Sequence, residues 1–382
     1  MYGFFTVFMF LCLVRSGMSN SVLDYGAVGD GETDDSQAFL KAWDSICESE
    51  EVSPRLIIPA GKTFLLNPVH FQGPCKAPNV RVSVEGNIIA PEMSKWNNGD
   101  ESRWLGFFNV NGLIVTGSGQ VDGNGQSWWG CAGKSTIVFH NCHNLQLRGL
   151  TFIDSPKNHI SINDVHGATI SNLHITAPED SENTDGIDIS ESTNIEIRDL
   201  IIGTGDDCIA INGQSSFINI TNVACGPGHG ISVGSLGAHG AYDTVEEVHV
   251  KNCNFTNTQN GVRIKTWQGG SGYARKISFE QIFLDSVKNP VIIDQYYCTG
   301  GHCDTHAHQN VKISDVTYSG VHGSSRKTAA ISLNCSRSVA CTDIVMNDVK
   351  IDSVDPGIKT YSFCINAHGT SDSTSPDVPC LA

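Results

Sequence analysis

Charge and long apolar runs are the two features that this sequence has least of. Charged residues fill only 17% of its 382 positions, and 40 acidic residues against 24 Lys and Arg give a formal net charge of −16. Nucleic acid is therefore not expected as a partner, because binding to phosphates requires clustered Lys and Arg. Beyond the N-terminus no apolar stretch approaches the about 20 residues that cross a bilayer, so no membrane partner is expected either. An anionic ligand would have to be held by a local cationic patch.

The N-terminus has the features of a secretory signal peptide. Residues 3–14 form an apolar run, and small residues follow near Gly17 and Ser19, where a signal peptidase would cleave. No Lys or Arg precedes the run, which is unusual for a signal, and a buried N-terminal strand or helix is the alternative. We predict a signal peptide at residues 1–20, a single domain at residues 21–382, and export from the cell. Asn-x-Ser/Thr sequons at Asn219, Asn254 and Asn334 are then candidate glycosylation sites.

Cysteine, in contrast, is abundant. Cys12 lies in the predicted signal, and 13 of the 14 cysteines remain, which indicates disulfide bonds formed in an oxidising compartment. An odd number leaves at least one thiol unpaired. No pair of CxxC motifs is present, which argues against a zinc site. Short separations predict the pairs Cys298 with Cys303, Cys335 with Cys341 and Cys364 with Cys380, and Cys208 with Cys225 would join two neighbouring repeats.

A nine-residue pattern, apolar at positions 1, 3, 6 and 8, recurs eight times. Its units begin at Leu145, Ala168, Ile195, Ile218, Val248, Ile277, Val311 and Ile344. Alternation at positions 1 and 3 is typical of a β-strand, and the longer step to position 6 indicates a bend before a second strand. A third short apolar segment lies between units, as in "HISI" at His159, "GIDI" at Gly186 and "CIAI" at Cys208. Each repeat thus has about three strands and no helical pattern.

Repeats of this kind bury their apolar faces by stacking on one another. Eight or more three-stranded coils predict an all-β fold, a right-handed parallel β-helix (solenoid). A leucine-rich repeat, the alternative, requires a fixed L-x-x-L-x-L core that is absent. The stretch "DDSQAFLKAWDSIC" has helical apolar spacing and predicts a short N-terminal capping helix, with Asp34, Asp35 or Ser36 as its cap. The last 30 residues lose the period. A disulfide bond between Cys364 and Cys380 would hold a C-terminal tail that closes the far end of the solenoid.

Polar residues recur in one column, two positions before the first apolar residue of the third strand in each coil. The column comprises Asn158, Asp185, Asp207, His229, Asn260 and Asn289. Because stacked strands lie about 4.8 Å apart, successive members become neighbours in space. Asp206 adjoins this column, and strand alternation directs Arg263 and Lys265 to the outer face of the next coil. Asn ladders and turn residues are the structural alternative, but three crowded carboxylates with two cations favour a functional site.

Four short motifs in this region resemble the signatures of one family. "NTDG" at Asn183, "GDDC" at Gly205, "GHG" at Gly228 and "RIK" at Arg263 resemble, in order and spacing, those of the polygalacturonases, glycoside hydrolases that cut pectin. The stretch "VLDYGAVGDGETDDSQAF" from Val22 is similar to the N-terminus of plant members. The resemblance covers nearly all of the chain after the signal. It implies a parallel β-helix, a polygalacturonate (pectin) substrate and a place in the cell wall.

The resemblance also implies a mechanism. The family inverts the anomeric configuration, so that one acid protonates the leaving oxygen while a base activates water from the opposite face. Carried over by motif, Asp206 is the general acid, and Asp185 and Asp207 hold and deprotonate the water. His229 is expected to hydrogen-bond Asp206 or the substrate. We further expect the charges of Asp185 and Asp207 to raise the pKa of Asp206, so that this acid keeps its proton.

Substrate-binding residues follow from the same resemblance. Arg263 and Lys265 are expected to bind carboxylates of the substrate, Arg263 by a two-pronged contact and Lys265 as a point charge. Tyr297 in "QYYC" resembles a tyrosine that contacts substrate in the family, although Tyr296 adjoins it. Trp267 is either a sugar-stacking residue or an ordinary surface aromatic. No cofactor and no metal is implied, and we expect a monomer.

Three alternatives share parts of this pattern. A pectate lyase would have the same fold and substrate but would eliminate with Ca²⁺ and a basic residue, and the GDD and GHG motifs argue against it. A rhamnogalacturonan hydrolase is disfavoured because Arg263 and Lys265 together suit a uniform galacturonate chain. A catalytically silent cell-wall protein would not need three intact acids. The sequence leaves endo or exo action open.

Overall fold

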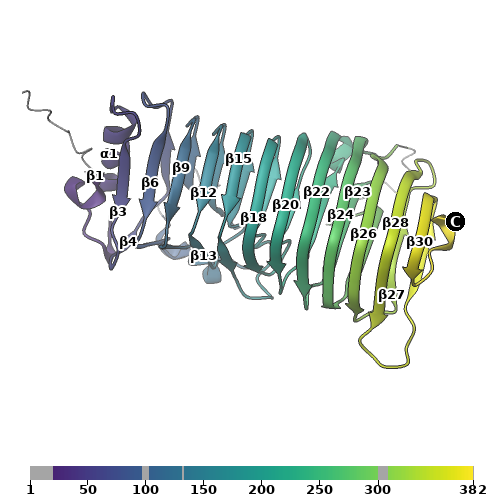
Figure 1. Ribbon diagram of the computed structural model, residues 1–382. Helices are drawn as coiled ribbons and strands as arrows, with labels where there is room; N and C mark the ends of the chain where they lie inside the picture. Colours follow the sequence, from purple (N-terminus) through teal and green to yellow (C-terminus); the bar gives the residue numbers. More distant parts are fainter. Residues whose placement is uncertain (1–19, 97–102, 131–132, 300–308, 382) are drawn as a thin grey trace, which may run out of the picture.

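The structure, a computed structural model, describes residues 20–96, 103–130, 133–299 and 309–381. Within them nearly all regular structure is β-strand, and successive coils pile up along one axis from the N-terminus to the C-terminus (Figure 1). Strands of neighbouring coils pair in parallel. The predicted right-handed parallel β-helix is therefore confirmed.

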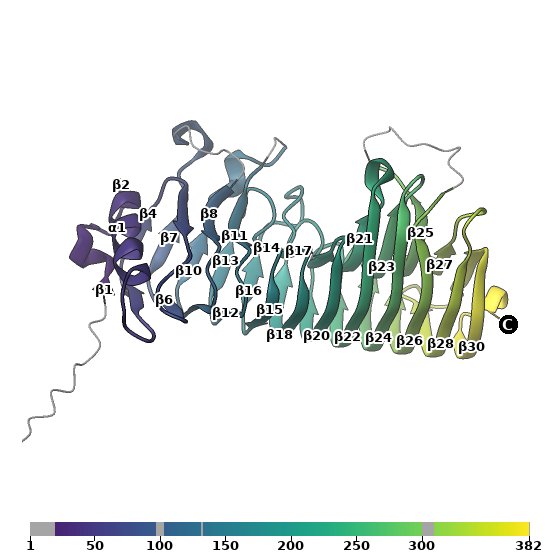
Figure 2. The ribbon, with the colours of Figure 1, turned by 90° about the horizontal axis from the view of Figure 1, so that it is seen from above.

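The described strands form two curled sheets, which lie on opposite sides of the β-helix (Figure 2). Sheet B takes one strand from each coil: β5 (Val69–Gln72), β8 (Arg103–Phe108), β11 (Ser135–His140), β14 (Ile160–Asn163), β17 (Ile187–Ser190), β19 (Ile209–Ile211), β21 (Ile231–Leu236), β23 (Asn260–Trp267), β25 (Asn289–Tyr297), β27 (Ala329–Asn334) and β29 (Tyr361–Ile365).

Sheet A contains the other strands: β1 (Asn20–Ser21), β2 (Asp30–Asp34), β3 (Arg55–Ile58), β4 (Thr63–Leu65), β6 (Val80–Val84), β7 (Asn87–Ile89), β9 (Leu113–Gly117), β10 (Gln120–Asp122), β12 (Leu145–Arg148), β13 (Thr151–Ile153), β15 (His166–Ser171), β16 (His174–Thr176), β18 (Thr193–Gly203), β20 (Ser215–Cys225), β22 (Tyr242–Thr256), β24 (Ser271–Val287), β26 (Lys312–Ser325), β28 (Cys341–Ser353) and β30 (Ala367–Ser375). From β18 onward the two strands that each coil gives to sheet A fuse into one long, bent strand. Each coil thus supplies three strand segments, as predicted.

The apolar positions of the repeat point into one continuous core. On β18 they are Ile195, Ile197, Leu200 and Ile202, all at most 1% exposed. The same positions of β20 lie directly opposite them in the next coil. Because side chains alternate along a strand, a slip of one residue would turn each apolar row toward solvent, so burial fixes the register of the stack.

The seventh predicted unit, starting at Val311, is displaced. In β26 the residue opposite Ile277 and Ile344 is Val316, five positions later. The first apolar residues of the predicted unit extend the inward row before the bend, where Ile313 lies opposite Ala274. The sequence of this long strand fits the nine-residue template fully from Val311 and, with Gly323 in the last apolar place, only in part from Val316, yet pairing with the neighbouring coils selects the second start.

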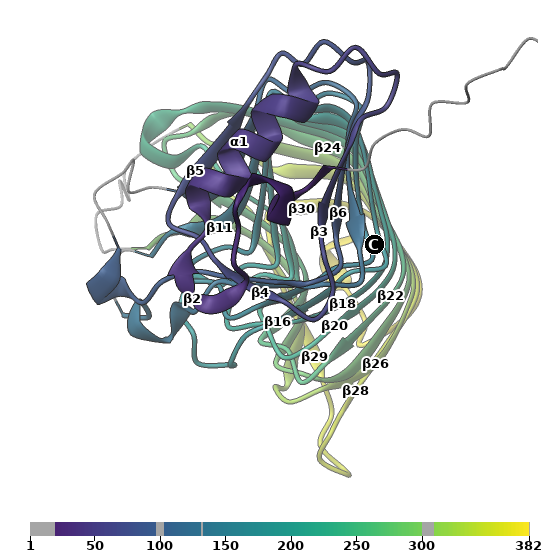
Figure 3. The same cartoon turned by 90° about the vertical axis from the view of Figure 1, so that its left-hand side faces the viewer.

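Both ends of the β-helix are closed. Helix α1 (Ser36–Cys47) lies across the N-terminal opening, as predicted (Figure 3). It buries Phe39, Trp43 and Ile46, and Trp43 Nε1 donates to the carbonyl oxygen of Gln72 at 2.9 Å. Asp35 is the N-cap residue, but its carboxylate accepts the N–H groups of a preceding loop instead of capping the helix.

The C-terminal end differs from the expectation. Strands β29 and β30 form a further coil, so the period does not end 30 residues before the terminus. The pattern is invisible in the sequence because Gly369 and Ser371 occupy the places opposite Ile344 and Met346. The closing tail is the short 3-10 helix at Pro379–Leu381, whose Leu381 is buried.

Disulfide bonds tie coils and ends together. The pairs Cys208 with Cys225, Cys335 with Cys341 and Cys364 with Cys380 are confirmed, and Cys47 with Cys75 joins α1 to the first coils. Cys303, the predicted partner of Cys298, lies outside the described residues. Cys142 and Cys253 are buried free thiols, and burial raises the pKa of each to about 11, which makes them poor nucleophiles.

The predicted signal peptide, apart from Asn20, lies outside the described residues, so it and the domain boundaries stay predictions. In the part of the chain that the structure describes, no helix is long and apolar enough to cross a membrane.

The bends between strands use the left-handed region of backbone space. In each coil the residue before the repeat unit has a positive φ; examples are Asn194 at 59° and Asp343 at 57°. Phe217, with φ of 55°, fills this place on β20, although bulky residues tolerate the left-handed region poorly. Its side chain is 51% exposed, so little packing offsets the strain.

We predict that Phe217→Asn stabilises the protein by about 1 kcal/mol, because Asn adopts positive φ more readily. Denaturant unfolding of both proteins measures the change. The reverse substitution at the equivalent place of the preceding coil, Asn194→Phe, should destabilise by a similar amount. A loss of stability in Phe217→Asn would show that contacts of the ring outweigh backbone strain.

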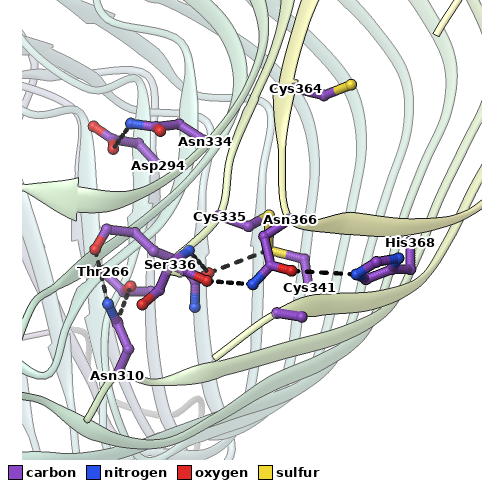
Figure 4. The surroundings of a disulfide bond; sticks show 12 residues. Thr266, Asp294, Asn310, Asn334, Cys335, Ser336, Cys341, Cys364, Asn366 and His368 are labelled. Carbon is purple, nitrogen blue, oxygen red and sulfur yellow. Dashed lines mark hydrogen bonds between the residues drawn. A yellow bond between two sulfur atoms is a disulfide. The ribbon is translucent and has the colours of Figure 1, made fainter. Parts of the chain in front are cut away.

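The three sequons differ in accessibility. Asn219 on β20 and Asn254 on β22 are exposed on the outer face of sheet A. Asn334, in contrast, donates from Nδ2 to Asp294 Oδ1 at 3.2 Å, and Ser336 of its sequon is only 3% exposed (Figure 4).

When the protein is secreted from a eukaryotic host, we therefore predict N-glycans at Asn219 and Asn254 and none at Asn334. Mass spectrometry before and after enzymatic deglycosylation tests this occupancy. Asn219→Gln and Asn254→Gln should each remove one glycan mass, whereas Asn334→Gln should leave the mass of the glycoprotein unchanged apart from the residue. Occupancy of Asn334 would contradict the prediction.

Candidate active site

The turns that precede the strands of sheet B stack directly on one another. Asp185, Asp207 and His229 stand two residues before β17, β19 and β21. Backbone hydrogen bonds join these turns, from Gly186 N–H to the carbonyl oxygen of Asp207 at 2.9 Å and from Cys208 N–H to that of Gly230 at 2.8 Å. The structure thus brings the three column residues together on successive coils.

Asp207 is fully buried within an ionic cluster. Its Oδ1 accepts from Arg263 Nη2 at 2.7 Å and from Ser232 Oγ at 2.8 Å, and its Oδ2 accepts from Lys265 Nζ at 2.8 Å. Arg263 Nε also donates to Ser232 Oγ at 3.0 Å. Both cations lie on β23 on either side of the core residue Ile264, and they are only 9% and 7% exposed. A buried carboxylate is compensated here by two charges and a hydroxyl.

Asp206 pairs with His229 instead. His229 Nδ1 lies 2.8 Å from Asp206 Oδ1, which also accepts the backbone N–H of Asp207 at 2.9 Å. Burial opposes ionisation of Asp206, but the hydrogen bond and charge of His229, with a contribution from Lys265, outweigh it and lower the pKa of Asp206. The expectation that neighbouring carboxylates raise this pKa is therefore wrong for the free protein, because the imidazole is closer and hydrogen-bonded.

The carboxyl groups that resist ionisation are Asp185 and Asp188. Burial, followed by the charges of Asp188, Asp206 and Asp207, raises the pKa of Asp185 well above its usual range. Burial and then the charge of Asp207 raise the pKa of Asp188 to about 7, against the opposing effects of Lys157 and Lys265. Asp185, Asp188 and Asp206 therefore interact strongly, and these three carboxyl groups titrate as a set.

Asp188 and Ser232 belong to a second column that the sequence reading missed. Strand register aligns Asp188 with Ala210, Ala210 with Ser232, and Ser232 with Arg263. All four occupy outward positions of sheet B, next to buried aliphatic residues. A signal was present, because Asp188 alternates with the apolar Ile187 and Ile189 and so had to face outward.

Aromatic side chains flank the cations. Lys265 Nζ lies 5.2 Å from the ring centroid of Tyr297, which also packs edge-on against Trp267 at 5.9 Å. The hydroxyl of Tyr296 instead accepts the backbone N–H of Arg337 in the following coil, at 3.0 Å. Of the two adjacent tyrosines, Tyr297 is therefore the one beside the predicted site residues.

The spacing of Asp206, Asp207 and His229 could also suit a metal ion, since their ligand atoms lie within 4.8 Å of one another. However, both oxygens of Asp207 are already ion-paired with Arg263 and Lys265. A divalent cation would have to displace or face these two positive charges. The donor set therefore fits proton transfer between carboxyl groups better than metal binding.

Comparisons with known proteins agree with this chemistry. Residues 47–375 match the model of glycosyl hydrolases family 28. A probable polygalacturonase of Arabidopsis thaliana is 47% identical over 379 residues, covering 97% of this chain and 82% of that protein. A polygalacturonase of Persea americana is 40% identical over 358 residues, covering 91% and 76%. The crystal structure of an endo-xylogalacturonan hydrolase from Aspergillus tubingensis superposes with a TM-score of 0.79 at 25% identity, over 94% of this chain and 100% of that one.

The family match spans most of the chain, including the coils that carry the acids, and the relatives extend over nearly its whole length. The chain therefore belongs to family 28 of the glycosyl hydrolases and is a glycosidase.

Proposed function

We propose that this protein hydrolyses α-1,4-galacturonosyl linkages of polygalacturonate, the acidic polymer of pectin, with inversion at the anomeric carbon. The observation that carries the proposal is the pairing of Asp206 with His229 beside an Asp207 held by Arg263 and Lys265. This arrangement combines acid–base groups with cations suited to an acidic sugar. The names of the relatives, polygalacturonases from several plants, support the same substrate.

Asp206 is the general acid of the proposed reaction. In the free protein its pKa is lowered, so the acid must gain its proton when substrate arrives. A galacturonate chain brings negative charges and excludes water, and both effects raise the pKa of a nearby carboxyl group. His229, which shares the hydrogen bond with Asp206, is positioned to hold that proton and return it.

Asp185 and Asp207 hold and deprotonate the attacking water. Arg263 and Lys265 each bind one oxygen of Asp207, and these contacts fix the position of the carboxylate that orients the water. Asp185 has a raised pKa, so its ionised form accepts the proton of the water readily. Arg263, through its remaining nitrogen Nη1, binds a substrate carboxylate together with Lys265, and Tyr297 packs against the bound sugar.

The proposed setting is the plant cell wall. The disulfide bonds and exposed sequons suit a secreted protein, and the chain acts there as a monomer without a metal or cofactor. The predicted signal peptide at residues 1–20 would direct this export.

The first test is catalysis by the wild-type protein and by Asp206→Asn. Wild type should release reducing ends from polygalacturonate, and nuclear magnetic resonance of the first product should show the inverted anomer. Asp206→Asn should lower kcat by about 10²–10⁴-fold, since general acid catalysis contributes that much.

The control is Asp44→Asn, which removes an exposed carboxylate on α1 and should keep full activity. An unsaturated product that absorbs in the ultraviolet would instead identify a lyase. Full activity of Asp206→Asn would remove Asp206 from its proposed role.

A second test uses the raised pKa of Asp188. The folded protein holds this proton more tightly than the unfolded chain, whose Asp pKa is about 3.9. Stability is therefore lost as the pH rises from about 4 through about 7, where Asp188 ionises in the folded state. Asp188→Asn removes this loss and should raise the free energy of unfolding by about 2 to 4 kcal/mol at pH 8, but not at pH 3.5.

Denaturant unfolding at the two pH values measures the difference, and Asp44→Asn should show no such dependence. Equal gains at both pH values would mean that the effect of Asp188→Asn comes from packing and not from ionisation.

A further inference from the structure

We propose that Lys288 and Arg326 form a second carboxylate-binding subsite, which holds a galacturonate unit away from the scissile bond. This inference rests on the proposed function and extends it toward the C-terminal coils. Nothing in the four family motifs includes either residue, since both follow the last motif in sequence.

A hollow beside His229 provides the space. It has a volume of about 200 Å³ and is lined by Glu179, Gly228, His229, Gln259, Lys288 and Arg326. His229 thus contacts both the hollow and Asp206, the proposed acid. A polymer bound at the acid can therefore continue into the hollow without leaving the protein surface.

The hollow follows the same stack of turns that carries the acids. Gln259 N–H donates to the carbonyl oxygen of Gly228 at 2.7 Å, and Asn289 N–H donates to that of Gln259 at 3.0 Å. In the next coil, Arg326 N–H donates to the carbonyl oxygen of Val287 at 2.8 Å. At about 4.8 Å per coil, the turn of Lys288 lies about 10 Å beyond that of His229, far enough for another sugar unit.

The charges of this subsite are available, unlike those at Asp207. Arg263 and Lys265 are buried and ion-paired, so a substrate carboxylate must share them. Lys288 is exposed, and its Nζ makes no hydrogen bond or ion pair with any residue that the structure describes. Arg326 is held in place by Nη2, which donates to the carbonyl oxygens of Asn257 at 3.1 Å and Thr258 at 3.2 Å. A guanidinium fixed in this way is pre-organised for a carboxylate.

Glu179 on the rim of the hollow carries the opposite charge. Its carboxylate repels an incoming galacturonate, while the two cations attract it, so the subsite has a net positive charge before His229 is counted. Glu179→Gln is therefore expected to increase the affinity for substrate. The proposal can thus be tested with a variant that strengthens substrate binding as well as with variants that weaken it.

The experiment measures KM and kcat for hexagalacturonate with the full-length secreted protein at low salt. Lys288→Met combined with Arg326→Gln should raise KM about five- to tenfold and leave kcat within twofold, because two partly exposed charge contacts are lost. The effect should shrink at 0.3 M salt, where exposed charges are screened. Glu179→Gln should lower KM.

Two controls separate the subsite from general charge and from folding. Lys41→Met removes an exposed cation from α1, far from the hollow, and should leave KM unchanged. Lys288→Met alone removes no observed intramolecular contact, so its smaller increase in KM remains informative if the loss of Arg326 disturbs the turn. Binding of fully methyl-esterified hexagalacturonate, which carries no carboxylates, should be equal in wild type and in the double variant when it is measured by calorimetry.

The outcomes distinguish the two proposals. If wild type releases no reducing ends from polygalacturonate, the proposed function fails, and this subsite fails with it. If wild type is active but Lys288→Met and the double variant keep the wild-type KM for hexagalacturonate, only the subsite is wrong. An equal loss of affinity for the esterified and the free hexamer would likewise overturn it, because carboxylate recognition would not be the cause.

Discussion

The register between stacked coils is the constraint on which both stability and function depend. Rows of buried Ile, Leu and Val fix that register, because a one-residue slip would expose every apolar row. The same register places Asp185, Asp207 and His229 on successive turns. The hydrophobic core therefore specifies the site as well as the fold, because the register of the coils is enough to bring residues distant in sequence close together.

Stacking acids in one column has an electrostatic cost that the scaffold offsets in two ways. Around Asp207 it supplies cations, since Arg263 and Lys265 each bind one carboxylate oxygen. Around Asp185 and Asp188 it supplies none at hydrogen-bonding distance among the described residues, and raised pKa values reduce the negative charge there instead. A buried ion pair adds little stability by itself, so this arrangement is better explained by chemistry than by folding.

Much of the fold could be predicted because the same apolar pattern recurs in successive coils. Details that depend on how strands of neighbouring coils pair could not be predicted. The period predicted the coils, but only the neighbouring strands showed that Val316, and not Val311, begins the seventh unit. Motifs predicted the acids, and alternation would have revealed Asp188. The lowered pKa of Asp206 could not be predicted, because it depends on the position of one imidazole nitrogen 2.8 Å away. Tyr297 was distinguished from Tyr296 by packing alone.

An acidic protein that acts on an acidic polymer needs cationic side chains for two different tasks, and the two tasks require different degrees of burial. Cations that position a catalytic carboxylate have to be buried, since desolvation makes their contacts strong and fixed. Cations that attract a chain of carboxylates have to be exposed, since a buried, neutralised charge exerts little pull on an approaching polymer. With a net charge of −16, the protein as a whole repels such a polymer. Exposed cations along the same stack of turns as the acids can then attract the substrate locally. Lys288 and Arg326 meet this requirement because they are exposed, whereas Arg263 and Lys265 are buried and ion-paired.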